Sequence, residues 1–179
     1  MKQLVLLFTK AISGLFFRKK FLKGRWFETT NLGWVWVLKG IWFQKVLGFN
    51  RNVPWPMSPN SKISNPNNIE FHPDNLDNFQ SPGCYFQNYA AKIYIGHGSY
   101  IAPNVGIITA NHNPENLDET GKTEDVHIGN RCWIGMNAVI LPGVKLGDNT
   151  IVGAGSVVTK SFDGKCVIGG IPAKIIKEL

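Results

Sequence analysis

The feature that most constrains this chain is a six-residue period over residues 128–163. Every sixth residue of this stretch is aliphatic, and a glycine follows four of the six aliphatic residues. An α-helix repeats about every 3.6 residues and an isolated β-sheet about every two, so neither produces this spacing. The period predicts a parallel β-helix, a stack of coils in which each six-residue unit forms one side. The positions expected to point inward are Ile128, Ile134, Ile140, Leu146, Val152 and Val158.

A second set of residues with the same period predicts the corners of the coil. Asn and Gly dominate this set, and these two residue types adopt a positive φ angle more readily than others. Five of the six residues that follow the corners are compact enough for a narrow interior. The predicted corner residues are Arg131, Asn137, Gly143, Asn149, Gly155 and Ser161.

The period also extends towards the N-terminus, with one interruption. Residues 113–126 are polar and acidic and show no period, so we predict a loop ejected from the coil. Loops carried on a rigid scaffold often hold functional sites. Beyond the repeat, Pro172 suits the first turn of a short helix that closes the open end of the coil. The N-terminal residues in phase with one another are Tyr89, Ile95, Ile101 and Ile107.

These features divide the chain into four predicted parts. The β-helix domain covers residues 83–166, and a C-terminal capping segment with a short helix covers 167–179. Residues 53–82 form a connecting segment rich in turn residues, in which the coil begins irregularly. Residues 1–52 form an arm that is mostly helical. The predicted fold is therefore all-β, with helices confined to the two ends of the chain.

The arm differs from the rest of the chain in charge and in aromatic content. It holds ten of the 19 basic residues and one of the 12 acidic residues, and five of the six tryptophans lie within residues 1–55. Lysines interrupt its two apolar stripes, so neither is long enough to span a membrane. Two interpretations remain open: the stripes lie in an anionic membrane interface, which the composition slightly favours, or they pack on the coil or on a neighbouring subunit. The large apolar surface argues against binding to nucleic acid.

The cysteines indicate a reducing compartment. There are three of them, without a CxxC motif or paired spacing, so we expect neither a disulfide framework nor a zinc site. Cys132 lies at one of the compact inward positions and is predicted to be a core residue. We therefore predict a cytoplasmic protein. On the membrane interpretation of the arm, the contact would be with the inner face of the cell membrane.

Residues 83–179 resemble the hexapeptide-repeat acyltransferase superfamily through the stretch VHIGNRCWIGMNAVILPGVKLGDNTIVGAGSVV and the later segment CVIGGIPAK. Within the superfamily they are most similar to the maltose and galactoside O-acetyltransferases and the polysaccharide O-acetyltransferases. The resemblance implies a left-handed triangular prism, a homotrimer, and acetyl-CoA bound in a groove between adjacent subunits. The left hand follows from the resemblance alone, because parallel crossovers in general prefer the right hand.

His112, in the motif TANHNP, matches the position of the family's catalytic histidine. An imidazole that titrates near neutrality can accept the proton of a sugar hydroxyl while the oxygen attacks a thioester carbonyl. The resemblance therefore implies direct transfer in a ternary complex, with His112 as the general base. Several polar groups nearby could orient its ring.

The resemblance also assigns contacts to acetyl-CoA. Trp133 would lie against the pantetheine arm, and one backbone N–H in the groove could stabilise the oxyanion of the tetrahedral intermediate. Two lysines would lie near the phosphates, where their charge is complementary. The plainer alternatives are an aromatic contact between subunits for Trp133 and solvated surface lysines. The assigned contacts are Trp133, Gly135, Met136, Gly153, Ala154, Lys160 and Lys174.

Asn88 and Asn111 are assigned to the sugar acceptor. No metal is predicted, because the closely spaced histidines of the metal-binding enzymes built on the same prism are missing. The predicted function is transfer of an acetyl group to a hydroxyl of a bacterial surface polysaccharide or of its lipid-linked precursor. The alternatives are an N-acetyltransferase that acts on an amino sugar nucleotide and a non-catalytic, membrane-docked trimeric scaffold.

Overall fold

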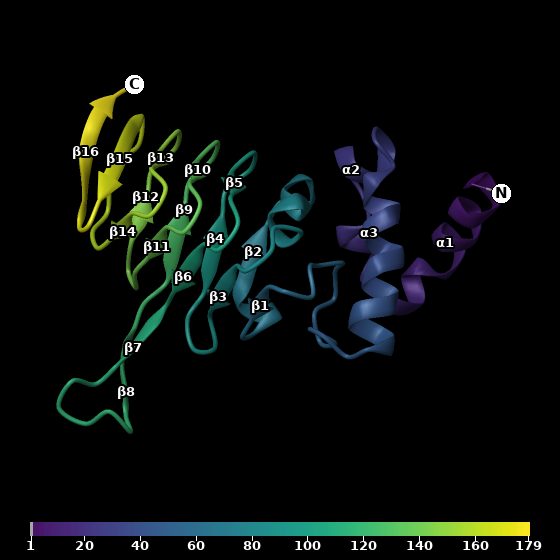
Figure 1. Ribbon diagram of the computed structural model, residues 1–179, viewed down its shortest axis with the longest axis horizontal. Helices are drawn as coiled ribbons and strands as arrows, with labels where there is room; N and C mark the ends of the chain where they lie inside the picture. The colour runs from purple at the N-terminus through teal and green to yellow at the C-terminus, as the bar shows by residue number, and fades with distance from the viewer. Residues whose placement is uncertain (1) are drawn as a thin grey trace.

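Parallel strands stack into a three-sided coil in the computed structural model, which describes residues 2–179 (Figure 1). Along each face, strands from successive coils pair in parallel, most of them 18 residues apart where the chain is uninterrupted. Face A contains β1 (Lys62–Ile63), β3 (Tyr85–Gln87), β6 (Gly106–Ile108), β11 (Val139–Ile140) and β14 (Val157–Val158). Face B contains β2 (Ile69–Phe71), β4 (Ile93–Ile95), β9 (Val126–Ile128) and β12 (Lys145–Leu146). Face C contains β5 (Tyr100–Ile101), β10 (Trp133–Ile134), β13 (Ile151–Val152), β15 (Cys166–Gly170) and β16 (Ala173–Glu178).

The predicted inward residues form the core of this coil. All six aliphatic side chains of the period are at most 2% exposed. Burial of one such side chain contributes about 1.5–3 kcal/mol, so the stacked columns dominate the stability of the coil. Cys132 is buried among them as predicted, and this burial raises the pKa of its thiol.

Five of the six predicted corner residues have a positive φ angle, between 52° and 77°. The sixth, Ser161, does not, and this prediction was wrong. The last coil is shorter, since Phe162 pairs with Leu146 after 16 residues, whereas Leu146 pairs with Ile128 after 18. The positive φ angles of the final turn fall instead on Gly164 and Lys165.

The coil begins inside the segment predicted to be a connection. Its first turn contains β1, β2 and two 3₁₀ helices, η3 (Pro66–Asn68) and η4 (Pro73–Phe79). Helix η4 lies beside β5 at the edge of face C, where a further strand would otherwise pair. The Asn78 side chain accepts the N–H of Ile101 at 2.8 Å and donates to the carbonyl of Ser99 at 2.9 Å. This side chain therefore replaces ladder hydrogen bonds and ends the sheet.

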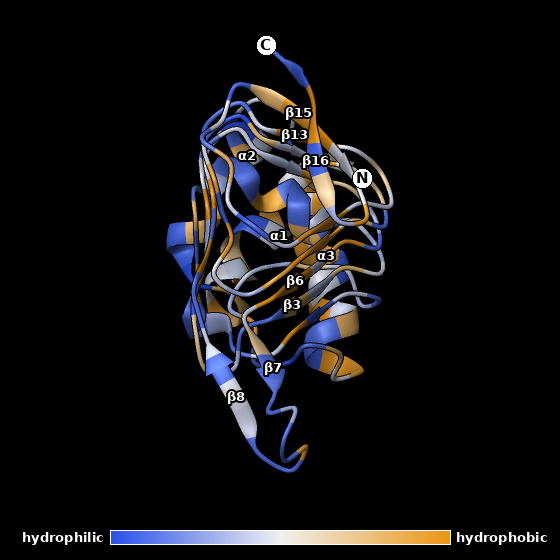
Figure 2. Cartoon of the chain, turned by 90° about the vertical axis from the view of Figure 1, so that its left-hand side faces the viewer, coloured by the Kyte–Doolittle hydropathy of each residue, from blue (hydrophilic) through white to orange (hydrophobic). Residues whose placement is uncertain are grey.

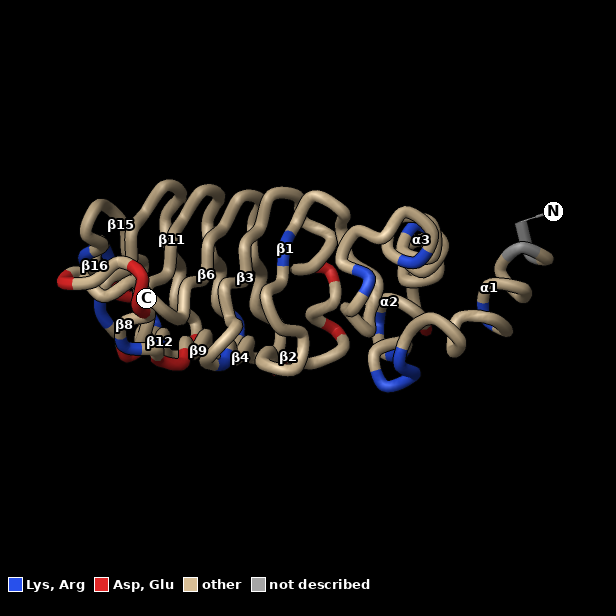
Figure 3. The backbone as a smooth tube through the Cα atoms, turned by 90° about the horizontal axis from the view of Figure 1, so that it is seen from below, with Lys and Arg blue, Asp and Glu red and all other residues tan. Residues whose placement is uncertain are grey.

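The arm is helical along most of its length and covers the N-terminal end of the coil (Figure 1). Its helices are α1 (Lys2–Phe16), η1 (Lys19–Phe21), α2 (Arg25–Glu28), α3 (Leu32–Gly40) and the π-helix η2 (Ile41–Val46). Figure 3 shows several Lys and Arg residues on this helical end of the molecule, and others along the coil. Within residues 2–179, no helix combines the length and the hydropathy needed to cross a bilayer.

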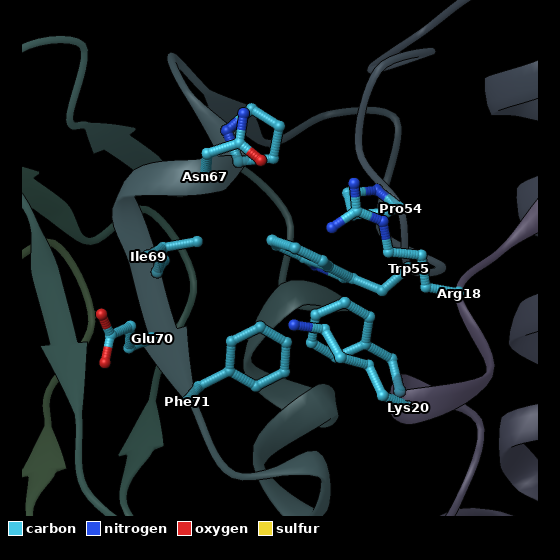
Figure 4. A pocket seen from close by; sticks show the side chains of 10 residues that line it. Arg18, Lys20, Pro54, Trp55, Asn67, Ile69, Glu70 and Phe71 are labelled. Carbon is cyan, nitrogen blue, oxygen red and sulfur yellow. The ribbon is translucent and has the colours of Figure 1, made fainter.

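An aromatic cluster joins the arm to the first coil. Phe21 stacks on Phe71 with ring centroids 5.2 Å apart and meets Trp55 edge-on at 4.8 Å. A hollow of about 490 Å³ opens beside this cluster, and Arg18 and Lys20 lie across it from strand β2 (Figure 4). The aromatic contacts fix the arm to the coil, so part of it is integral to the fold.

The C-terminal segment is a strand, and the predicted closing helix is absent. Strand β16 pairs antiparallel with β15 and extends face C. Ile175 and Ile176 are 51% and 68% exposed, so they do not cap the interior. The unpaired edge of β15 offers hydrogen-bond partners to a returning strand, and β-branched isoleucine favours an extended backbone.

The predicted ejected loop is a β-hairpin that extends away from the coil (Figure 2). Its strands are β7 (Ala110–His112) and β8 (Thr120–Thr123), which pair antiparallel. The hairpin leaves face A after β6 and returns to face B at β9, so it projects from the edge between these faces. We call this the A/B edge.

Candidate functional site

His112 lies at the end of β7, and a backbone contact inside the hairpin holds its imidazole. Its Nδ1 atom is 2.8 Å from the carbonyl oxygen of Leu117. A carbonyl oxygen only accepts hydrogen bonds, so Nδ1 carries the proton and Nε2 keeps its lone pair. The ring is exposed, and Nε2 can therefore accept a proton from a bound molecule.

A hollow of about 720 Å³ surrounds His112 at the A/B edge. The hairpin forms one wall through residues that include Asn111 and Pro114, and the next coils supply the other wall. Lys122 and Glu124 also line the hollow, and they form an ion pair of 2.8 Å between Nζ and Oε1. The space is large enough for a sugar unit beside the imidazole. The coil residues that line it are Leu141, Pro142 and Thr159.

The two predicted acceptor residues lie in different environments. Asn111 is exposed and lines the hollow beside His112, and its contact with the acceptor stays a prediction. Asn88 is fully buried and lies away from this hollow, so the prediction for Asn88 was wrong. Its side chain accepts the N–H of Asn65 at 3.0 Å and donates to the carbonyls of Asn65 and Asn68. These bonds use both its amide hydrogens, and Asn88 joins two coils of the scaffold.

The predicted pantetheine contacts gather at another edge, where face C turns into face A. We call this the C/A edge. Met136 and Ala154 lie there on successive coils, 18 residues apart, and both are exposed. Within the described part of the chain neither backbone N–H donates a hydrogen bond, although those of Gly135 and Gly153 do. Two outward amide donors thus lie one above the other along this edge.

Gly135 is required by the close approach of the coils at the C/A edge. A Cβ atom there would lie 2.6 Å from the backbone nitrogen of Ala154 and 2.7 Å from the carbonyl oxygen of Val152. The equivalent atom on Gly153 would be no closer than 3.4 Å to its neighbours. Trp133 lies just before this edge, on β10, and its side chain is 56% exposed over face C.

The two predicted phosphate contacts lie on different parts of one chain. Lys160 follows Thr159 on the A/B edge, with Nζ 5.7 Å from the ring centroid of Phe162. Lys174 lies on β16, opposite Gly169 of β15, at the far end of face C. Both side chains are exposed.

The predicted site therefore divides into two groups within one chain. Asn111, His112 and Lys160 belong to the A/B edge, whereas the pantetheine contacts belong to the C/A edge. The five strands of face A separate these edges. The repeat indicated the positions of both groups, but no signal in the sequence pointed to the carbonyl of Leu117 as the group that orients His112.

Comparison with known proteins identifies the coil. Residues 125–160 match the family described as bacterial transferase hexapeptide (six repeats). The chain carries a bacterial transferase hexapeptide repeat. The resemblance inferred from the sequence is thereby confirmed for residues 125–160.

Known hexapeptide-repeat proteins share about half of the chain. A galactoside O-acetyltransferase of Escherichia coli (strain K12) is 40% identical over 90 residues, which are 49% of this chain and 44% of the relative. The crystal structure of a maltose O-acetyltransferase from Clostridium difficile 630 is 39% identical with a TM-score of 0.50, over 54% of this chain and 52% of the other.

A hexapeptide-repeat acetyltransferase from Vibrio cholerae, solved as a complex with acetyl coenzyme A, is 32% identical with a TM-score of 0.51. The alignment covers 54% of each chain. This chain thus spans about half the length of the relatives it matches. The family match at residues 125–160 does not include the helical arm.

Proposed function

We propose that the protein is an acetyl-CoA-dependent O-acetyltransferase with His112 as its general base. The observation that carries the proposal is the 2.8 Å contact between Nδ1 of His112 and the Leu117 carbonyl, which leaves Nε2 free to accept a proton. The hollow at the A/B edge offers space for a sugar hydroxyl next to that atom. The acetyltransferases that share the hexapeptide repeat support the choice of acetyl donor.

The proposed reaction is a single transfer. Nε2 of His112 takes the proton of the acceptor hydroxyl while its oxygen attacks the thioester carbonyl carbon of acetyl-CoA. The tetrahedral intermediate carries a negative oxygen, and the free amide of Met136 or Ala154 is a suitable donor to it. Collapse of the intermediate expels the thiolate of coenzyme A, which recovers the proton from the imidazolium.

This chemistry needs the A/B edge of one chain next to the C/A edge of another. We propose a homotrimer in which face A lies towards the neighbouring subunits, because both edges border this face. The outward side chains of Ile108, Val139 and Val157 on face A are apolar and only partly exposed. Face B instead presents polar groups such as Glu70, His127 and Lys145. Apolar surface is the more favourable one to bury between subunits.

Acetyl-CoA would then lie in the groove between two subunits. Trp133 and the C/A edge of one subunit would contact the pantetheine arm. Lys160 of a second subunit and Lys174 would approach the phosphates from separate chains, which explains why one chain does not bring these two lysines together.

For the acceptor, we propose a bacterial surface glycan in its lipid-linked form, brought to the enzyme at a membrane. The arm supports this choice, because α1 exposes Leu4, Leu7, Phe8 and Leu15, each at least 62% exposed. Lys10 lies in the same helix, and Arg18, Lys19 and Lys20 follow it; Figure 3 shows Lys and Arg on this helical end of the molecule. An exposed apolar helix face next to cationic side chains suits an anionic membrane interface.

The test is acetyl transfer and acetyl-CoA binding by wild type and by His112→Ala. A general base contributes about 10²–10⁴-fold to the rate, so we expect the variant to lose that factor while its acetyl-CoA affinity and oligomer mass stay unchanged. His127→Ala is the matched control, since His127 stacks on Tyr94 of face B, away from the hollow. Full activity of His112→Ala would remove His112 from the mechanism, and absence of acetyl-CoA binding by the wild type would overturn the proposed function.

A further inference from the structure

A cluster of two histidines and one aspartate lies at the edge between faces B and C, apart from the proposed active site. His72 and Asp74 come from the first coil, and His97 comes from the second. One potential ligand atom from each of the three residues lies within 4.8 Å of the other two. We propose that His72, Asp74 and His97 bind a divalent transition metal ion such as Zn²⁺.

Two of the three distances between these donors are close to those around a bound ion, and the third, between the two imidazole nitrogens, lies within 4.8 Å. Oδ2 of Asp74 is 3.5 Å from Nδ1 of His72 and 3.4 Å from Nε2 of His97. In a tetrahedral site with metal–ligand bonds of about 2.0–2.1 Å, neighbouring ligand atoms are about 3.3–3.4 Å apart. An ion on the solvent side of Oδ2 therefore needs only a small approach of the two imidazoles.

The carboxylate of Asp74 is already oriented for this role. Its Oδ1 accepts the backbone N–H of Arg25 at 2.8 Å, which leaves Oδ2 directed towards the histidines. The carbonyl of Asp74 accepts the indole N–H of Trp26 at 2.8 Å and the Nε–H of Arg25 at 3.2 Å. Hydrogen bonds of this kind orient ligands in metal sites and raise their affinity.

The two histidines also suit a metal. Their rings contact each other edge-on with centroids 4.4 Å apart, so each restricts the rotation of the other. Nδ1 of His72 accepts the N–H of Asp74 at 3.2 Å, which keeps this nitrogen unprotonated. That hydrogen bond is long, and coordination would replace it. Both rings are exposed, and His72 also borders an open hollow of about 550 Å³, so an ion and a water ligand have access.

The site would connect three parts of the molecule. Two ligands belong to the first coil and one to the second, and the hydrogen bonds of Asp74 reach α2 in the arm. A bound ion would therefore fasten the arm to the coil. Anything that binds the native state and not the unfolded state stabilises the fold, so the ion should raise the midpoint of thermal unfolding.

The test is calorimetric titration of ZnCl₂ into the full-length chain without a histidine tag, after treatment with EDTA and its removal. We expect saturable binding of one ion per chain and a higher midpoint of thermal unfolding. His97→Ala and His72→Ala should each weaken the affinity at least about tenfold and abolish the thermal shift. His127→Ala should bind as the wild type does.

Three results would overturn the proposal: no saturable binding to the wild type, unchanged binding to both His72→Ala and His97→Ala, or an equal loss in His127→Ala. Circular dichroism of each variant in EDTA verifies that it is folded before zinc is added. The expected acetyl transfer is independent of zinc, so failure of this proposal is distinguishable from failure of the proposed function.

Discussion

Single residues decide how closely the coils approach each other, and the two glycines of the C/A edge differ in this respect. At Gly135 a Cβ atom would collide with the backbone of the next coil, whereas at Gly153 it would be in ordinary contact. Neither glycine has a positive φ angle, so alanine at either position adds no backbone strain. A difference in stability between the two alanine variants would therefore reflect packing alone.

We therefore expect Gly135→Ala to lower the free energy of unfolding by about 1–3 kcal/mol, the usual cost of inserting a methyl group into a tightly packed site. Gly153→Ala should lower it far less. Thermal or denaturant unfolding of the two variants measures the difference. Equal destabilisation by both substitutions would contradict the close approach of the coils at Gly135.

At the scale of elements, two elements outside the coil supply the proposed functional groups. The hairpin β7–β8 carries the proposed base, and helix α1 carries the proposed membrane contact. The hairpin supplies both the histidine and the carbonyl that orients it, so the proposed base and its positioning group belong to one element. Helix α1 supplies an exposed apolar surface, while η1 and the aromatic residues after it are fixed to the coil. Deletion of the whole arm would expose this aromatic core, so point substitutions in α1 give the cleaner test of membrane binding.

We expect the double variant Leu7→Glu and Phe8→Glu to lose flotation with vesicles that contain anionic lipid, because two carboxylates would replace apolar contacts at a negative surface. The side chains of Leu7 and Phe8 are 64% and 62% exposed, so we expect the substitutions to leave the fold unchanged. The control is the pair Ile171→Glu and Ile176→Glu, which are similarly exposed at the opposite end of the molecule. Flotation that persists in the α1 variant, or is lost equally in the control, would contradict the membrane proposal.

At the scale of the whole molecule, the separation of the two edges makes assembly a condition for the proposed activity. The proposed base and the proposed pantetheine groove flank face A, so one chain cannot place both at the same thioester. A mixture of two inactive variants can therefore restore activity when each variant damages a different edge.

We expect His112→Ala and Ala154→Arg to be inactive alone, the second because a large side chain would fill the groove. In trimers reassembled from equal amounts of both, about a quarter of the intersubunit sites combine two intact edges, so about a quarter of wild-type activity should return. Mass measurement verifies reassembly. Absence of any recovery in mixed trimers would mean that each site lies within a single chain.

Much of the fold could be predicted from the sequence because its signals are local. An inward aliphatic residue and a positive φ angle at a corner each depend on one six-residue unit. The period therefore predicted the coil and five of the six corners correctly. The prediction of a corner at Ser161 was wrong because the last coil is short. The prediction of a closing helix was wrong because the free edge of β15 favours a paired strand. Both errors arise at the end of the repeat, where the period no longer applies.

The coil, the ejected segment and the place of His112 at the end of a strand could be predicted without a structure, because they follow from periodicity and from its interruption. The folded structure was needed to show that Asn88 is buried between coils, that the Leu117 carbonyl orients His112, and that the proposed coenzyme contacts lie on a different edge from the proposed base. It also brought His72, Asp74 and His97 together. Each of these results depends on which residues meet after the chain has completed a turn of the coil, and spacing along the sequence does not contain that information.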